Sequence, residues 1–93
     1  MIIAVDFDGT LKISGQANIK LLAALKNKQK KGDVVILWTC REGSSLREAV
    51  LFLREHGFVP NFINSNCPEG IKRMGHDSRK VFADVYIDDK GAR

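Results

Sequence analysis

The sequence predicts an α/β fold in which helices cover a mostly parallel sheet. Apolar runs of strand length recur along the 93-residue chain, and segments with apolar residues at helical spacing separate them. Strands that alternate with helices pair in parallel through right-handed crossovers. A chain of this length forms one domain and leaves no room for a second core. We therefore assign residues 1–93 to a single domain.

Four segments are predicted to be strands, and they are residues 2–6, 33–39, 58–64 and 83–89. The first two are continuous apolar runs, which suit strands that are covered on both faces. Pro60 lies in the third, and this strand is expected at a sheet edge because proline cannot donate to a ladder. We predict a four-stranded sheet in the order 3-2-1-4, numbered along the chain. The expected architecture is a minimal Rossmann-like, three-layer sandwich.

The first predicted helix spans about residues 19–31, with Asn18 as its N-cap and Gly32 at its end. The basic run 26–31 closes this helix, where lysines complement the helix dipole. We interpret the net charge of +4 mainly as this solvated helix end. No aromatic residues that could stack on bases lie among the basic ones, so we do not expect nucleic acid as the main partner.

The second predicted helix begins with the pattern Ser-Leu-Arg-Glu, which is typical of a capping box. Ser45 is the expected N-cap and Glu48 its partner, and the helix ends at His56 and Gly57. The segment 65–79 is rich in Asn, Gly, Pro and charged residues. We expect it to be a loop with at most one helical turn.

The composition argues against several classes of protein. Cys40 and Cys67 lack CxxC spacing and are expected to be free thiols, and His56 and His76 have no cysteine partner at zinc-site spacing. No apolar run approaches the length of a membrane span, and the pattern of a signal peptide is missing. We expect a cytoplasmic protein without a membrane partner.

Two pairs of aspartates follow the first and fourth predicted strands. Asp6 and Asp8 lie in the stretch "VDFDGT", and Asp88 and Asp89 lie in "YIDD". In the order 3-2-1-4 these strands are neighbours, so the four carboxylates should meet at the edge where open α/β sheets bind ligands. Crowded carboxylates repel one another, and a hard divalent cation such as Mg²⁺ offsets that repulsion. The sequence therefore predicts a magnesium site at this edge.

Four short features occur in a characteristic order. They are the stretch "DFDGT", the threonine Thr39 that ends "VVILWT", Lys80, and the stretch "YIDDK". Together they resemble the four motifs of the haloacid dehalogenase superfamily of phosphotransferases, and the resemblance covers nearly the whole chain. Lys80 stands only eight residues before Asp88, fewer than is usual in the superfamily, so Lys72 is the alternative for the third motif.

The resemblance implies a magnesium-dependent phosphatase that hydrolyses a phosphate monoester through an aspartyl-phosphate intermediate. It implies that Asp6 is the nucleophile and that Asp8 acts as acid and then as base. The metal ligands implied are Asp6, Asp8, Asp88 and Asp89, with either of the last two as the direct ligand. An aspartate at position 8 favours phosphoryl transfer over dehalogenation, because halide leaves without a proton.

The resemblance also implies how the phosphoryl group is bound. Thr39 and Lys80 would contact its oxygens, and Gly9 would let the backbone approach closely. Cys40 and Arg41 directly follow Thr39 and are expected at the rim of the site. Arg41 is either a substrate contact or an ordinary surface arginine.

Substrate specificity in this superfamily usually comes from inserted cap domains. The connection over residues 10–18 is too short for one, and the segment between the second and third motifs holds only a helix, a strand and a loop. We expect an open site and a phosphorylated small molecule or macromolecule as substrate. A non-catalytic phosphate- or metal-binding module, and a phosphatase that acts on nucleic-acid ends, stay open as alternatives. Exposed strand edges favour a homo-oligomer.

Overall fold

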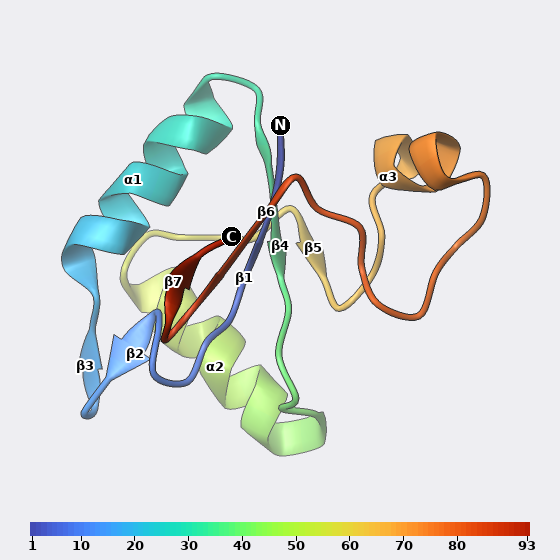
Figure 1. Cartoon of the computed structure of the whole chain (residues 1–93). Coiled ribbons are helices and arrows are strands. Elements are labelled where there is room, and N and C mark those ends of the chain that lie inside the picture. The colour runs from blue at the N-terminus through green and yellow to red at the C-terminus, as the bar shows by residue number, and fades with distance from the viewer.

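Five strands form one sheet at the centre of the protein (Figure 1). The computed structural model describes residues 1–93. The sheet strands are β1 (Ile2–Val5), β4 (Val34–Leu37), β5 (Phe62–Ile63), β6 (Val85–Asp88) and β7 (Gly91–Ala92), while β2 (Lys12–Ile13) and β3 (Gln16–Ala17) form a separate hairpin. The helices are α1 (Ile19–Lys30), α2 (Gly43–Glu55) and α3 (Pro68–Met74). The predicted α/β fold is confirmed.

The sheet has the order β5-β4-β1-β6-β7. β1 pairs in parallel with β4 and with β6, and β4 pairs in parallel with β5. The short strand β7 pairs antiparallel with β6, so the predicted count of four strands is wrong. The sequence contains no apolar run that predicts β7. Gly91 has φ of 110°, a conformation that glycine adopts without strain and that helps the chain turn back onto β6.

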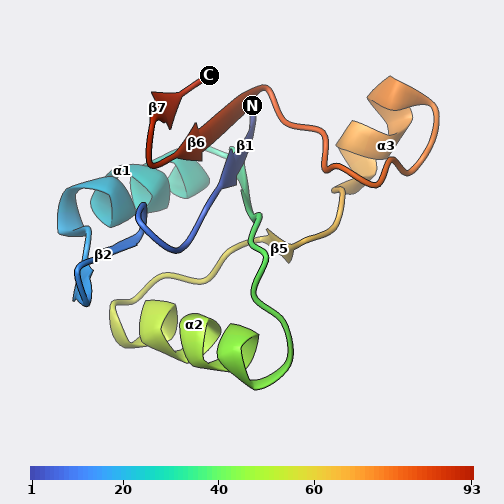
Figure 2. The same cartoon turned by 60° about the horizontal axis from the view of Figure 1, so that its bottom comes forward.

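Both faces of the central strand β1 are buried. Ile3 and Val5 pack into one apolar cluster with residues of α1 and α2, whereas Ile2 and Ala4 pack into a second cluster on the other face. Figure 2 shows α1 and α2 on one side of the sheet and α3 on the other. Burial on both faces explains why β1 is a continuous apolar run. None of the helices is long and apolar enough to cross a membrane.

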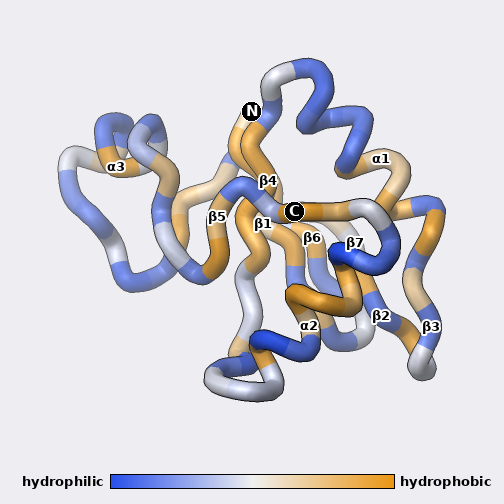
Figure 3. The backbone as a smooth tube through the Cα atoms, turned by 180° about the vertical axis from the view of Figure 1, so that it is seen from behind, coloured by the Kyte–Doolittle hydropathy of each residue, from blue (hydrophilic) through white to orange (hydrophobic).

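Helix α1 begins and ends close to the predicted residues. The side-chain oxygen of Asn18 accepts a hydrogen bond from the N–H of Leu21 at 3.2 Å, which confirms the predicted N-cap. Lys28 and Lys30 lie in the last turn, where their charges favour the helix dipole. Figure 3 shows this hydrophilic end of α1 on the outside of the fold.

Helix α2 begins three residues earlier than the sequence predicts, and its start is not a capping box. Its N-cap is Glu42, which makes no side-chain capping bond, and Gly43 is the first helical residue. The Ser45 hydroxyl donates instead to the carbonyl oxygen of Glu42 at 2.9 Å. The prediction of Ser45 as N-cap is therefore wrong. The other end of α2 is as predicted, with His56 as its C-cap.

The third predicted strand is shorter than expected, because only Phe62 and Ile63 pair as β5. It lies at an edge of the sheet, as Pro60 predicts. The segment that follows it contains α3, seven residues long, in place of the single helical turn that we expected. Pro68 occupies its first turn, where the missing N–H of proline costs no hydrogen bond.

Two leucines of α2 offer a direct test of this packing. Leu53 is fully buried, whereas Leu51 is 52% exposed. We expect Leu53→Ala to lower the free energy of unfolding by about 2–5 kcal/mol, because the substitution removes apolar contacts and leaves a cavity. Leu51→Ala is the matched control and should change it by about 0.5 kcal/mol or less. Urea denaturation of the two variants measures the difference, and equal effects would contradict the described orientation of α2.

Candidate active site

A cleft of about 500 Å³ lies at the carboxyl ends of three neighbouring strands. Asp6 directly follows β1, Thr39 comes two residues after β4, and Asp88 ends β6. The lining includes Asp6, Thr39, Cys40, Lys80, Asp88 and Arg93. Of the residues that the sequence singles out, Asp8, Gly9, Arg41 and Asp89 lie outside this lining.

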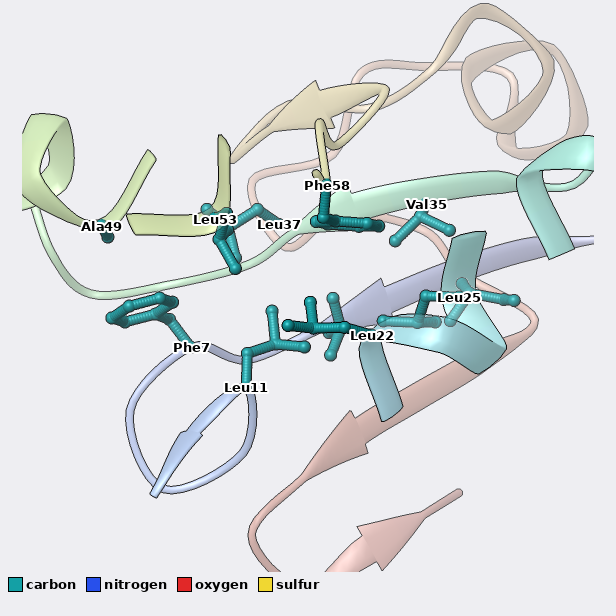
Figure 4. Packing of buried hydrophobic residues seen from close by; sticks show 11 residues of the cluster. Phe7, Leu11, Leu22, Leu25, Val35, Leu37, Ala49, Leu53 and Phe58 are labelled. Carbon is teal, nitrogen blue, oxygen red and sulfur yellow. The ribbon is translucent and has the colours of Figure 1, made fainter. Parts of the chain in front are cut away.

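The turn after β1 fixes the directions of the two aspartates in "DFDGT". The N–H groups of the residues at positions 10, 11 and 12 all donate to the carbonyl oxygen of Phe7, at 3.2, 2.9 and 3.1 Å. The Phe7 side chain is fully buried and packs in the core together with Leu11 (Figure 4). Because Phe7 is held in the core, the carboxylates of Asp6 and Asp8 on either side of it stay outside the core.

Asp6 is half-buried and is held by the backbone on both sides. Its N–H donates to the carbonyl oxygen of Ile87 in β6 at 2.9 Å, and its carboxylate accepts the N–H of Phe7 at 2.8 Å. Burial raises the pKa of Asp6, and the charges of three other aspartates, at positions 8, 89 and 88, raise it further. The hydrogen bond from Phe7 opposes this rise in pKa. The ionised form of the Asp6 carboxyl group is therefore disfavoured at this position.

Asp8 is exposed and turns toward Arg41. The two side chains form a bidentate ion pair, with Nε–Oδ2 and Nη2–Oδ1 distances of 2.9 Å each. The hydrogen bonds from Arg41 hold the pKa of Asp8 below its usual value. The sequence named Arg41 as either a substrate contact or a surface residue, and it did not indicate this pairing across 33 positions.

The two aspartates after β6 have different surroundings. The carboxylate of Asp88 accepts the N–H of Lys90 at 2.8 Å and pairs with Arg93 at 2.7 Å. Asp89 forms no ion pair, and its Cβ lies 3.5 Å from the place that a Cβ on Gly9 would take. Gly9 has φ of 75°, which glycine adopts without strain. The turn that contains Gly9 therefore lies close to Asp89, and a side chain at position 9 would contact Asp89.

Thr39 is held at the end of β4 by its neighbours. Its hydroxyl oxygen accepts the N–H of Arg41 at 3.1 Å, and its own N–H donates to the Asn64 side chain at 2.8 Å. Asn64 has φ of 51°, a left-handed conformation that asparagine tolerates better than most residues. The sequence analysis missed Asn64, and its only signal is an asparagine directly after an edge strand. Cys40 is an exposed free thiol.

Lys80, unlike Lys72, lines the cleft. The Lys80 ammonium lies 4.6 Å from the centre of the Tyr86 ring, and Tyr86 also lines the cleft. Lys72 lies in the last turn of α3 and is exposed. Of the two lysines that the sequence left open for the third motif, only Lys80 shares a cavity with Asp6.

A buried asparagine holds the segment that carries Lys80. The Asn66 amide donates to the Asp77 carboxylate at 2.8 Å and to the Ser78 carbonyl oxygen at 2.9 Å, and its oxygen accepts the N–H of Phe82 at 2.6 Å. These bonds span 11 to 16 positions, so no local pattern indicates them. Asn66 is a supporting residue that the sequence analysis missed.

The structure does not bring the four aspartates together into the one metal-binding cluster that the sequence predicts. No group of three or more His, Cys, Asp or Glu side chains lies close enough together to hold a metal ion. Asp8 and Asp88 are engaged by arginines, whereas Asp6 and Asp89 have no cationic partner. Mg²⁺ usually takes one or two carboxylates and completes its coordination with phosphate and water oxygens. Asp6 and Asp89 are thus the two aspartates without a cationic partner. A cation beside Asp6 would oppose the burial and the repulsion that raise its pKa.

Comparison with known proteins places this chain beside a solved structure. A conserved protein from Bacteroides thetaiotaomicron is 38% identical to it and superposes with a TM-score of 0.81, and the match covers 98% of this chain and 77% of that chain. No family model and no curated protein matches.

Proposed function

We propose that this chain, which belongs to the same family as the conserved Bacteroides thetaiotaomicron protein, is a magnesium-dependent phosphatase of the haloacid dehalogenase type. The observation that carries the proposal is the cleft, where a carboxylate, a hydroxyl and an ammonium group line one cavity at the carboxyl edge of the sheet. The adjacent strands β5, β4, β1 and β6 support it, because their order brings Asp6 and Asp88 to that edge.

The proposed reaction has two steps. Before the reaction, Asp8 leaves Arg41 and takes up a proton from solvent. In the first step, a carboxylate oxygen of Asp6 bonds to phosphorus while the bond from phosphorus to the leaving oxygen breaks, and protonated Asp8 gives that oxygen its proton. In the second, a water oxygen bonds to phosphorus, Asp8 accepts its proton, and the bond to Asp6 breaks. Inorganic phosphate leaves, and both aspartates return to their starting states.

Two side chains of the cleft suit the binding of a phosphoryl group. The hydroxyl oxygen of Thr39 already accepts the N–H of Arg41, so its O–H is free to donate to a phosphoryl oxygen. The Lys80 ammonium brings a positive charge into the same cavity. Interactions of this kind stabilise the charge of the transferring group in the transition state.

Asp6 and Asp89 are the residues that would hold Mg²⁺, with Asp88 as the alternative to Asp89. When bound, the ion supplies positive charge that offsets the negative charges of the phosphoryl group and of the nucleophile.

An activity assay of the purified protein with a panel of phosphate monoesters tests this proposal. We expect release of inorganic phosphate from an aryl phosphate in the presence of Mg²⁺, and loss of that release with excess EDTA. Restoration by added Mg²⁺ is the control for damage by the chelator. Equal release of phosphate in excess EDTA would contradict the magnesium requirement. No release of phosphate from any ester would contradict the proposed phosphatase activity.

Metal binding has a second readout that does not depend on activity. We expect Mg²⁺ to raise the Tm of the wild-type protein, because a ligand that binds only the folded state stabilises it. Asp6→Asn should lose most of this shift. In metal-free buffer near pH 7 the variant should be at least as stable as wild type, because a carboxyl with a raised pKa destabilises the fold when ionised.

The control variant is Asp33→Asn. Asp33 comes directly before β4, at the opposite edge of the sheet from the cleft. The Asp33→Asn protein should show the same rise in Tm with Mg²⁺ as the wild-type protein. An equal shift in wild type and in Asp6→Asn would remove Asp6 from the metal site.

A further inference from the structure

The ion pair between Asp8 and Arg41 occupies one complete edge of the arginine guanidinium group. Nε and Nη2 of Arg41 each donate to a different carboxylate oxygen of Asp8, at 2.9 Å. This forked geometry is the one by which arginine binds carboxylates and phosphates. Asp8 thus fills a site that is shaped for an anion.

Arg41 is held in place by groups other than Asp8. Its Nη1 donates to the carbonyl oxygen of Ser45 at 3.0 Å, its guanidinium lies 4.8 Å from the centre of the Phe7 ring, and its backbone N–H donates to Thr39. The Asp8 side chain, by contrast, is 60% exposed and its carboxylate has no partner besides Arg41. The guanidinium can therefore stay where it is when Asp8 turns away.

The observed pair is incompatible with the proton transfer that the proposed reaction requires. Both carboxylate oxygens of Asp8 accept hydrogen bonds from Arg41, and Asp8 does not line the cleft that contains Asp6. Asp8 must leave Arg41 before it can give a proton to a leaving oxygen beside Asp6. A second anion that binds the fork of Arg41 would compensate for this loss of its partner.

On the basis of the proposed function, we infer that Arg41 binds a second anionic group of the substrate, and that Asp8 occupies this site until the substrate arrives. The substrate is then a phosphate monoester whose leaving group carries a carboxylate, a phosphate or a phosphodiester. Such a group releases Asp8 only to the extent that it binds Arg41 better than Asp8 does, so it acts as a specificity determinant.

Two matched pairs of substrates test the inference and separate small molecules from polynucleotides. The first pair is butyl phosphate and 3-carboxypropyl phosphate, which differ in one terminal anionic group. The second pair is a nucleoside 5′-monophosphate and the 5′-phosphorylated dinucleotide, which adds a phosphodiester. We expect the wild-type kcat/KM for the doubly anionic member of at least one pair to be higher by about 10- to 100-fold, as a charge-assisted bidentate contact allows.

The variants show whether Arg41 is responsible. Arg41→Ala should abolish the preference, and Arg41→Lys should restore only part of it, because an ammonium group lacks the planar fork. Arg73→Ala is the matched control: Arg73 also forms a bidentate pair, with Asp84 at 3.0 and 3.2 Å, and lies 5.0 Å from the Phe82 ring, but it does not line the cleft. It should leave the wild-type preference intact.

The outcomes are distinct. A preference in the first pair alone identifies a small anionic metabolite, and a preference in the second pair identifies a polynucleotide end. Phosphate release without a preference in either pair would overturn the inference, and so would a preference that persists in Arg41→Ala. Either outcome would leave the proposed phosphatase activity unaffected. No release from any ester overturns both.

Discussion

Asp6→Asn lowers phosphate release from an aryl phosphate by about 10⁴-fold or more, the result that we expect when a covalent nucleophile is removed. An amide oxygen is a poor nucleophile toward phosphorus, and the cleft contains one other carboxylate, Asp88, which is already paired with Arg93. The initial rate of phosphate release with saturating Mg²⁺ measures the effect.

The fold of this variant should be intact. Asn is nearly isosteric with Asp, and its side-chain oxygen can still accept the N–H of Phe7 that Asp6 accepts at 2.8 Å. Circular dichroism and urea denaturation check this point, and Asp33→Asn serves as the control for activity. Substantial turnover by Asp6→Asn would show that a different residue, or water itself, attacks phosphorus.

Lys80→Ala should lower kcat by about 10²–10³-fold, the range observed when one preorganised donor to a developing negative charge is removed. Lys72→Ala is the control, because Lys72 is exposed on α3 and lies outside the cleft. We expect it to change kcat by less than about twofold, since it leaves the cleft untouched.

A further variant separates charge from packing at the same position. The Lys80 ammonium lies over the Tyr86 ring, so its loss also removes a contact inside the fold. Lys80→Arg keeps the positive charge and should retain more activity than Lys80→Ala at similar stability. A large loss in Lys72→Ala with a small loss in Lys80→Ala would transfer the role to Lys72.

The sheet could be predicted because its central strands are recognisable from their own residues, without knowledge of their partners in the fold. β1 and β4 are buried on both faces, so each is a continuous apolar run that no exposed segment would show. Pro60 placed the third strand at an edge for an equally local reason, its missing N–H. The N-cap of α1 was predictable because Asn18 acts on the next turn of its own helix.

The remaining features depend on partners that are distant in the sequence. Ser45 matches a capping pattern, but the chain enters α2 from the loop that carries Arg41, and Glu42 takes the cap position. The Arg41–Asp8 pair joins residues 33 positions apart. The sequence could nominate Asp8 and Arg41 as site residues, but not their mutual contact. β7 is only two residues long and has no apolar signal of its own.

Covalent trapping tests the central claim most directly. Wild-type protein is mixed with a ³²P-labelled aryl phosphate and Mg²⁺, quenched in acid within one turnover, digested and examined by mass spectrometry. Our account predicts a phosphorylated peptide that contains residues 1–12, with the phosphoryl group on Asp6 and no label in Asp6→Asn. Phosphate release without any labelled peptide, or label that persists in Asp6→Asn, would contradict it.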